Sequence, residues 1–109
     1  MFEVFKSDKS GKYYFNLKAA NGQVILSSQG YADMSGAKNG IESVMKNCAD
    51  DSKFERKTAS NGKFHFSLKA GNGQIVGTSQ MYASEAGMEN GISSVKKNAP
   101  GAEVKERED

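Results

Sequence analysis

An internal repeat constrains this chain more than any other feature of its sequence. When the chain is shifted by 51 positions, residues 11–47 lie over residues 62–98 without a gap, and 21 of the 37 aligned pairs are identical. The segments LKAANGQVILSSQGYA (17–32) and LKAGNGQIVGTSQMYA (68–83) show the match most clearly. Two repeats are too few for a solenoid, in which each unit is covered by its neighbours. We therefore expect a single domain over residues 1–109, built from repeats 1–52 and 53–109 around a pseudo-twofold axis.

Strand patterns open each repeat. Segments 12–18 (KYYFNLK) and 63–69 (KFHFSLK) alternate apolar and polar residues, which is typical of half-buried strands. An Asn-Gly pair then precedes a second strand pattern, and this dipeptide predicts a two-residue hairpin turn. With such a turn Leu17 faces Leu26 and Lys18 faces Ile25, while Lys69 faces Val76 in the second repeat. This register places Ile25 and Val76 on the polar face of the sheet.

A helix follows the hairpin in each repeat. Asp33 and Ser84 are good N-caps, and apolar residues recur at helical spacing after them. Short strand patterns at the start of the chain, near Phe54 and near Val104 complete the order β-β-β-α-β-β-β-α-β. This pattern predicts an α+β fold: one antiparallel sheet with both helices on one face. The expected core is Phe15, Leu17, Ile41, Val44, Phe54, Phe66, Leu68, Ile92 and Val95.

The same residues carry a family resemblance. Residues 58–84 (TASNGKFHFSLKAGNGQIVGTSQMYAS), residues 91–98 (GISSVKKN) and their counterparts in the first repeat resemble the YegP-like family of small bacterial proteins of unknown function. The resemblance implies tandem β(3)-α-β repeats that form one sheet, with helices packed on it and C-terminal strands swapped between the repeats. It implies no activity, cofactor or catalytic residue.

Composition narrows the classes of function. The net charge is +2, and because segment 103–109 has four acids and two bases (−2), the rest of the chain carries +4. Only two of the fifteen basic residues are Arg, which argues against sequence-specific reading of DNA. No apolar run approaches the ~20 residues of a membrane span, and the first residues do not resemble a signal peptide. With Cys48 as its single cysteine, the protein is expected to be cytoplasmic.

No catalytic or metal-binding pattern stands out. One His and one Cys fall on different elements, so we expect no metal and no cofactor. Neither a phosphate-binding G-x-x-x-x-G-K-[ST] motif nor a G-x-S-x-G motif occurs. His65 aligns with Tyr14 and is expected to be an exposed strand residue, while Cys48 is expected to be a small packed residue. The pattern is more typical of a protein without enzymatic activity.

The sheet face away from the helices is the candidate binding surface. Because an antiparallel sheet can leave one face in water, a merely solvated face is the simplest interpretation. The alternative is a shallow platform for a polyanion, a peptide or another copy of the chain, which is then a monomer or a weak homodimer. Its expected residues are Tyr14, Asn16, Lys18, Ser27, His65, Ser67, Lys69 and Thr78, flanked by Gln29 and Gln80.

Three functions stay open at this point. The first is a non-catalytic binding or interaction module that uses this face. The second is a small enzyme with a site near His65, Tyr82 and a lysine, and the third is weak binding of single-stranded nucleic acid through Lys and Tyr14.

Overall fold

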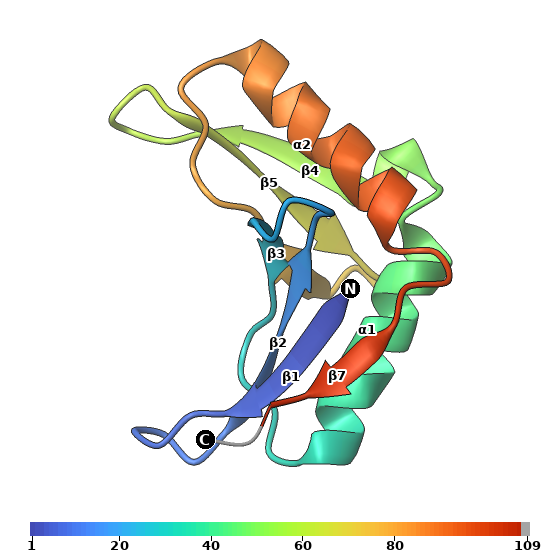
Figure 1. Cartoon of the computed structure of the whole chain (residues 1–109). Helices are drawn as coiled ribbons and strands as arrows, with labels where there is room; N and C mark the ends of the chain where they lie inside the picture. The colour runs from blue at the N-terminus through green and yellow to red at the C-terminus, as the bar shows by residue number, and fades with distance from the viewer. Residues whose placement is uncertain (108–109) are drawn as a thin grey trace.

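The computed structural model describes residues 1–107, and its elements follow the order predicted from the sequence (Figure 1). Each repeat supplies a three-stranded meander and a helix of fourteen residues. The elements are β1 (Phe2–Lys6), β2 (Tyr13–Lys18), β3 (Val24–Ser27), α1 (Met34–Asn47), a short 3₁₀ turn η1 (Asp51–Lys53), β4 (Phe54–Thr58), β5 (Phe64–Lys69), β6 (Ile75–Thr78), α2 (Glu85–Asn98) and β7 (Val104–Glu106).

All strands join one sheet in the order β4-β5-β6-β3-β2-β1-β7. The expected swap is confirmed, because β7 at the end of the second repeat lies beside β1, and β4 after the first helix lies beside β5. The expectation of a purely antiparallel sheet is wrong at one place: β7 runs parallel to β1. The chain reaches β7 through a helix rather than a tight hairpin turn, so no hairpin forces an antiparallel pairing.

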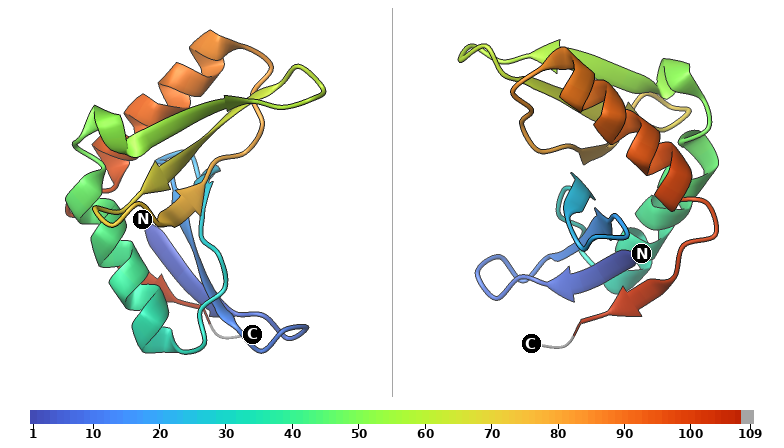
Figure 2. Two further views of the ribbon diagram at one scale, coloured as in Figure 1. Left: turned by 180° about the vertical axis from the view of Figure 1, so that it is seen from behind. Right: turned by 45° about the horizontal axis from the view of Figure 1, so that its top comes forward.

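The two repeats meet at the middle of the sheet. There β3 and β6 pair antiparallel through Ser27 and Thr78, which are equivalent positions of the repeats, so the pseudo-twofold axis passes between them. Both helices cover the same face of the sheet, as the views in Figures 1 and 2 show. Every residue of the expected core is buried. The boundary between repeats at residues 52 and 53 stays a prediction.

The hairpin turns differ from the expected type. Gly22 has φ +85°, but Asn21 has a negative φ, so the turn is not the two-residue type that needs two left-handed residues. The Gly22 N–H donates to the Ala19 carbonyl at 2.9 Å, and the Ala19 N–H donates to the Gln23 carbonyl at 2.9 Å. These bonds define a three-residue loop that ends in a left-handed glycine, and Gly73 closes the same loop in the second repeat.

The longer loop is accompanied by a β-bulge, which shifts the pairing of the two hairpin strands by one residue. Lys18 lies opposite Val24 instead of Ile25, and Lys69 lies opposite Ile75 instead of Val76. In a bulge, two successive residues of one strand oppose one residue of its neighbour. Ile25 and Val76 therefore belong to the buried core, and their expected position on the polar face is wrong.

Helix capping and close packing fix the positions of the helices. As expected, the side chains of Asp33 and Ser84 cap the helices by accepting from the N–H groups of Gly36 and Gly87, at 2.7 and 3.0 Å. Further along α2, Gly91 lets the helix approach the sheet. A Cβ at this position would lie 2.7 Å from Cζ of Tyr82, so only glycine leaves room for that ring. Gly40 has the same role in the first repeat, where a Cβ would lie 2.8 Å from Cζ of Tyr31.

Candidate functional site

A row of polar residues crosses the whole helix-free face. The register places Asn16 between Glu3 and Ser27, and it places Ser67 between Thr78 and Glu55. Since Ser27 also pairs with Thr78, the row is continuous from one edge of the sheet to the other. It consists of Lys105, Glu3, Asn16, Ser27, Thr78, Ser67 and Glu55.

Two carboxylates form ion pairs with the two lysines that were predicted to lie on this face. The Lys18 ammonium donates to Oε2 of Glu3 at 3.2 Å, and Lys69 forms the equivalent ion pair with Glu55. Hydrogen bonds from Lys69 and Lys57 lower the pKa of Glu55 to about 2. Sequence reasoning missed both carboxylates, although the alternation of FEVFK and FERKT could have placed them on this face. The centre of the face is therefore less cationic than expected.

An aromatic contact lies at the β1 end of the face. The ring of Tyr14 stacks on Phe5, with 5.9 Å between the centroids and 20° between the planes. The guanidinium of Arg107 lies 4.4 Å from the Phe5 centroid and also donates to Oε1 of Glu3 at 2.7 Å. Tyr14 is therefore half-buried, and this end of the face is held together by its own contacts.

His65 lies on the opposite half and differs from the expectation of an exposed side chain. It is half-buried beside Lys57 of β4, and its Nδ1 is buried without a hydrogen-bond partner. Tyr82 is on the other face, because its ring stacks on Phe66 and its hydroxyl reaches Gly91 under α2. The structure does not bring His65 and Tyr82 together, so the residues named for an enzymatic site do not form one cluster.

A groove of about 580 Å³ runs along the seam where β3 and β6 separate. Four pairs of equivalent residues line it: Val24 and Ile75, Ser27 and Thr78, Ser28 and Ser79, and Gln29 and Gln80, with Gly77 beside them. These side chains carry hydroxyl, amide and apolar groups but no charge. The groove lies on the pseudo-twofold axis, so its two halves offer nearly the same chemistry.

Equivalent polar side chains of the two repeats are not equally exposed on this face. Ser67 is 2% exposed, and its hydroxyl lies 3.4 Å from that of Thr78, so Ser67 is buried rather than available as expected. Its counterpart Asn16 is half-buried, while Ser27 and Thr78 are exposed. Among the central residues of the row, Ser27 and Thr78 at the seam are therefore more open to a ligand than Asn16 and Ser67.

Cys48 is fully buried at the end of α1, as expected for a packed residue. Burial raises the pKa of its thiol, which lowers its reactivity. Among residues 1–107, no group of three or more His, Cys, Asp or Glu side chains is placed to hold a metal ion. In the same part of the chain, no helix has the length and hydropathy needed to cross a bilayer.

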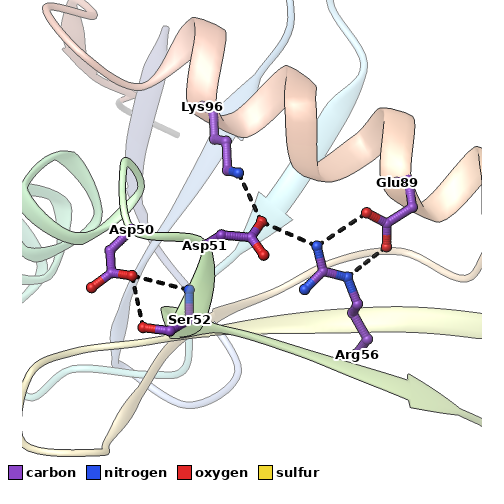
Figure 3. A network of polar contacts seen from close by, with 6 residues as sticks. All are labelled: Asp50, Asp51, Ser52, Arg56, Glu89 and Lys96. Carbon is purple, nitrogen blue, oxygen red and sulfur yellow. Dashed lines mark hydrogen bonds and ion pairs between the residues drawn. The ribbon is translucent and has the colours of Figure 1, made fainter.

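A separate ionic network ties α2 to the outer strand β4 (Figure 3). Arg56 donates to both carboxylate oxygens of Glu89, at 2.5 and 3.0 Å, and to Oδ1 of Asp51 at 3.1 Å. Lys96 donates to the same Asp51 oxygen at 2.8 Å. Hydrogen bonds from Lys96 and then Arg56 lower the pKa of Asp51, and the bond from Arg56 lowers that of Glu89. Sequence reasoning did not predict this network, because its members lie on three separate elements.

Comparison with known proteins connects the chain to described relatives. Residues 8–55 and 59–106 each match the family described as "Domain of unknown function (DUF1508)". A UPF0339 protein in the ptx operon 5' region of Stutzerimonas stutzeri is 58% identical over 105 residues, which cover 96% of this chain and 94% of the relative. The UPF0339 protein YegP of Escherichia coli K12 is 49% identical over 105 residues, with the same coverage of both chains.

Solved structures agree with this fold. The solution NMR structure of yegP from E. coli, a protein of unknown function, superposes with a TM-score of 0.92 at 48% identity, over 97% of this chain and 90% of the other. The solution NMR structure of UPF0339 protein SO3888 from Shewanella oneidensis gives a TM-score of 0.91 at 47% identity, over 96% and 88% of the two chains. The resemblance inferred from the repeats is thus confirmed.

Proposed function

We propose that this chain, which belongs to the UPF0339 family of bacterial proteins with tandem DUF1508 repeats, is a non-catalytic binding module that holds a ligand on its helix-free sheet face. The observation that carries the proposal is the seam groove between β3 and β6. It combines exposed hydroxyl and amide side chains with Val24 and Ile75, and concave sites of this mixed character are typical of ligand recognition.

The lining of the groove limits the chemistry of the ligand. Its side chains are uncharged, and Lys18 and Lys69 nearby are compensated by Glu3 and Glu55. A polar, weakly charged ligand such as an extended peptide fits this lining better than a highly charged polyanion. Because the groove lies on the pseudo-twofold axis, a ligand can bind in two nearly equivalent orientations.

A titration followed by NMR tests the proposal. The ¹⁵N-labelled protein is titrated separately with a pool of mixed hexapeptides, hexauridylate, hexathymidylate and AMP. We expect the peptide pool to shift the amide signals of residues 24–29 and 75–80. Shifts confined to α1 and α2, or none with any of the four probes, would contradict the proposal. Shifts on Tyr14 and the lysines with hexauridylate would favour binding of single strands instead.

Matched variants separate the groove from the rest of the sheet. Replacing Ser27 and Thr78 by Ala removes the two exposed hydroxyls from the lining, so it should weaken peptide binding. Replacing Gln23 and Gln74 by Ala is the control, since these equivalent, exposed glutamines lie outside the lining. Equal binding by the two double variants would exclude the groove as the site.

A cytoplasmic location is part of the proposal. The single, buried Cys48 supports it, because a chain with one unpaired thiol has no internal disulfide that needs an oxidising compartment. Fractionation of a native producing strain, with immunodetection of the protein in each fraction, tests this location.

A further inference from the structure

The two aliphatic side chains of the seam groove lie on the helix-free face, one from each repeat. Val24 is opposite Lys18, and Ile75 is opposite Lys69 in the second repeat. Directly opposed residues of neighbouring strands share one face of a sheet. Both lysines lie on the helix-free face, where each forms an ion pair. Val24 and Ile75 are half-buried on this face, whereas the aliphatic residue that follows each of them in the chain belongs to the core.

Two hydroxyl groups lie between the aliphatic side chains. Ser27 and Thr78 pair across the seam at the pseudo-twofold axis, and both are exposed. Among residues 1–107, they are the single residue pair that joins β3 to β6. Because these strands are antiparallel, Val24 lies on one side of the pair and Ile75 on the other. Along the seam, the groove therefore presents an aliphatic group, two hydroxyls and a second aliphatic group.

The bulges of the two hairpins set the distance between the aliphatic groups. Val24 and Ser27 are three residues apart in the chain, but their partners on β2, Lys18 and Asn16, are only two residues apart. The second repeat has the same offset. The bulge thus shortens the step, because two residues of one strand occupy the length of one residue of its neighbour. Each aliphatic group lies about 7 Å along the sheet from the central pair, so the two are about 13 Å apart.

An extended peptide along the seam matches this distance with residues four positions apart. Each residue of a strand advances about 3.3 Å, so four residues span about 13 Å. Because four is an even number, both side chains point to the same side of the peptide, and the residue midway between them does so too. Such a peptide can place two apolar side chains on Val24 and Ile75 at once.

On the basis of the binding function proposed above, we propose that the seam groove selects an extended segment of another protein in which two apolar residues lie four positions apart around a small polar residue. The apolar residues contact Val24 and Ile75, and the polar residue hydrogen-bonds to Ser27 or Thr78. A charged middle residue is disfavoured, because the groove lining contains no charged side chain to pair with it. Since the pseudo-twofold axis passes through the middle residue, the motif binds in either direction.

Three peptides of identical composition test the spacing. The valines lie four positions apart in acetyl-GTVSNSVTG-amide, three apart in acetyl-GTVSNVSTG-amide and six apart in acetyl-GVTSNSTVG-amide. The ¹⁵N-labelled protein is titrated with each peptide to millimolar concentration, and Kd is taken from the amide shifts of residues 24–29 and 75–80. The first peptide should bind about five-fold more tightly than the others, which can place only one valine at a time.

Each contrary result overturns a different part of the proposal. Equal binding of the three peptides at the groove would overturn the spacing and leave the binding function standing. The spacing also fails alone if none of them shifts these amides while the mixed hexapeptides do. If the hexapeptides shift none of them either, the binding function fails as well. Shifts of the same amides on dilution of the protein alone would show that a second copy fills the groove, which overturns the proposed partner.

Variants at the two aliphatic positions make the test specific. Val24→Ser combined with Ile75→Ser removes both apolar contacts, so the three peptides should bind about equally and weakly. Val104→Ser is the control, because this valine is 42% exposed on β7 and lies outside the groove lining, so the preference should stay unchanged. A preference for the four-residue spacing that survives in the double variant would overturn the proposal. Should the double variant not fold, the comparison of the three peptides on the unaltered protein decides alone.

Discussion

Replacing Gly91 by alanine tests the close approach of α2 to the sheet. Helix propensity alone predicts stabilisation, since alanine is about 0.8–1.0 kcal/mol better than glycine inside a helix. The structure predicts the opposite sign. The new Cβ would lie 2.7 Å from Cζ of Tyr82 and 3.2 Å from Cε2 of Phe66, both shorter than an ordinary contact between carbon atoms. The Tyr82 ring cannot easily move, because it stacks on Phe66 with 6.3 Å between centroids.

The magnitude follows from the two opposing effects. Overpacking a filled core costs about 1–3 kcal/mol. Subtracting the gain in propensity leaves a net destabilisation of about 1 kcal/mol, within a range of about 0–2. Gly87→Ala is the matched control one turn earlier in α2. Its Cβ would meet Oγ of Ser84 at 3.2 Å and no ring atom closer than 3.6 Å, so this variant should be neutral or slightly more stable than wild type.

Urea unfolding followed by circular dichroism measures the difference. A loss of about 1 kcal/mol corresponds to a midpoint lower by roughly 0.3–1 M urea. Because the atom nearest to the new Cβ is the Tyr82 hydroxyl, Tyr82→Phe should recover part of the loss in a double-mutant cycle. If Gly91→Ala is as stable as Gly87→Ala, the ring does not constrain the helix and the packing argument is wrong.

Three further outcomes are expected. Phe66→Ala removes a fully buried ring that contacts Phe54 and Tyr82, so it should cost roughly 3–5 kcal/mol, and an unchanged urea midpoint would mean that the ring faces water. The pKa of Glu55 is lowered from 4.5 to about 2, so between these pH values the folded chain binds fewer protons than the unfolded chain. The ion pairs of Glu55 therefore stabilise the fold above pH 4.5, and this stabilisation is lost as the pH falls toward 2. Urea midpoints at several acidic pH values should therefore fall less steeply for Glu55→Gln than for wild type. Finally, replacing Lys18 and Lys69 by Gln should weaken peptide binding at the helix-free face only slightly, because both lysines are already paired with carboxylates. The same change should remove most of the salt dependence of binding, measured between ~20 and ~300 mM NaCl. Complete loss of binding would show that the ligand is strongly anionic.

Features that depend on neighbours along the chain could be predicted from the sequence. Alternation in residues 12–18 and 63–69 set which side chains are buried, and the caps at Asp33 and Ser84 set where the helices begin. These signals are local, because a strand repeats every two residues and a helix every 3.6 residues. The duplication also predicted one non-local relation, the pseudo-twofold symmetry between the repeats. This symmetry placed equivalent residues of both repeats on the helix-free face. The bulge escaped prediction because Asn-Gly is compatible with loops of two and of three residues.

Tertiary structure decided what lies beside each element. Glu3 and Lys18 are fifteen residues apart and form an ion pair only because β1 and β2 are neighbours. Arg56, Asp51 and Glu89 meet only because η1, β4 and α2 converge at one edge. Strand order and the parallel pairing of β7 with β1 depend on contacts between residues about one hundred positions apart, which no local periodicity encodes. Duplication gave the chain two similar halves, but within residues 1–107 strand β7 pairs with β1 alone, so the two halves differ at the edges of the sheet and β4 ends it.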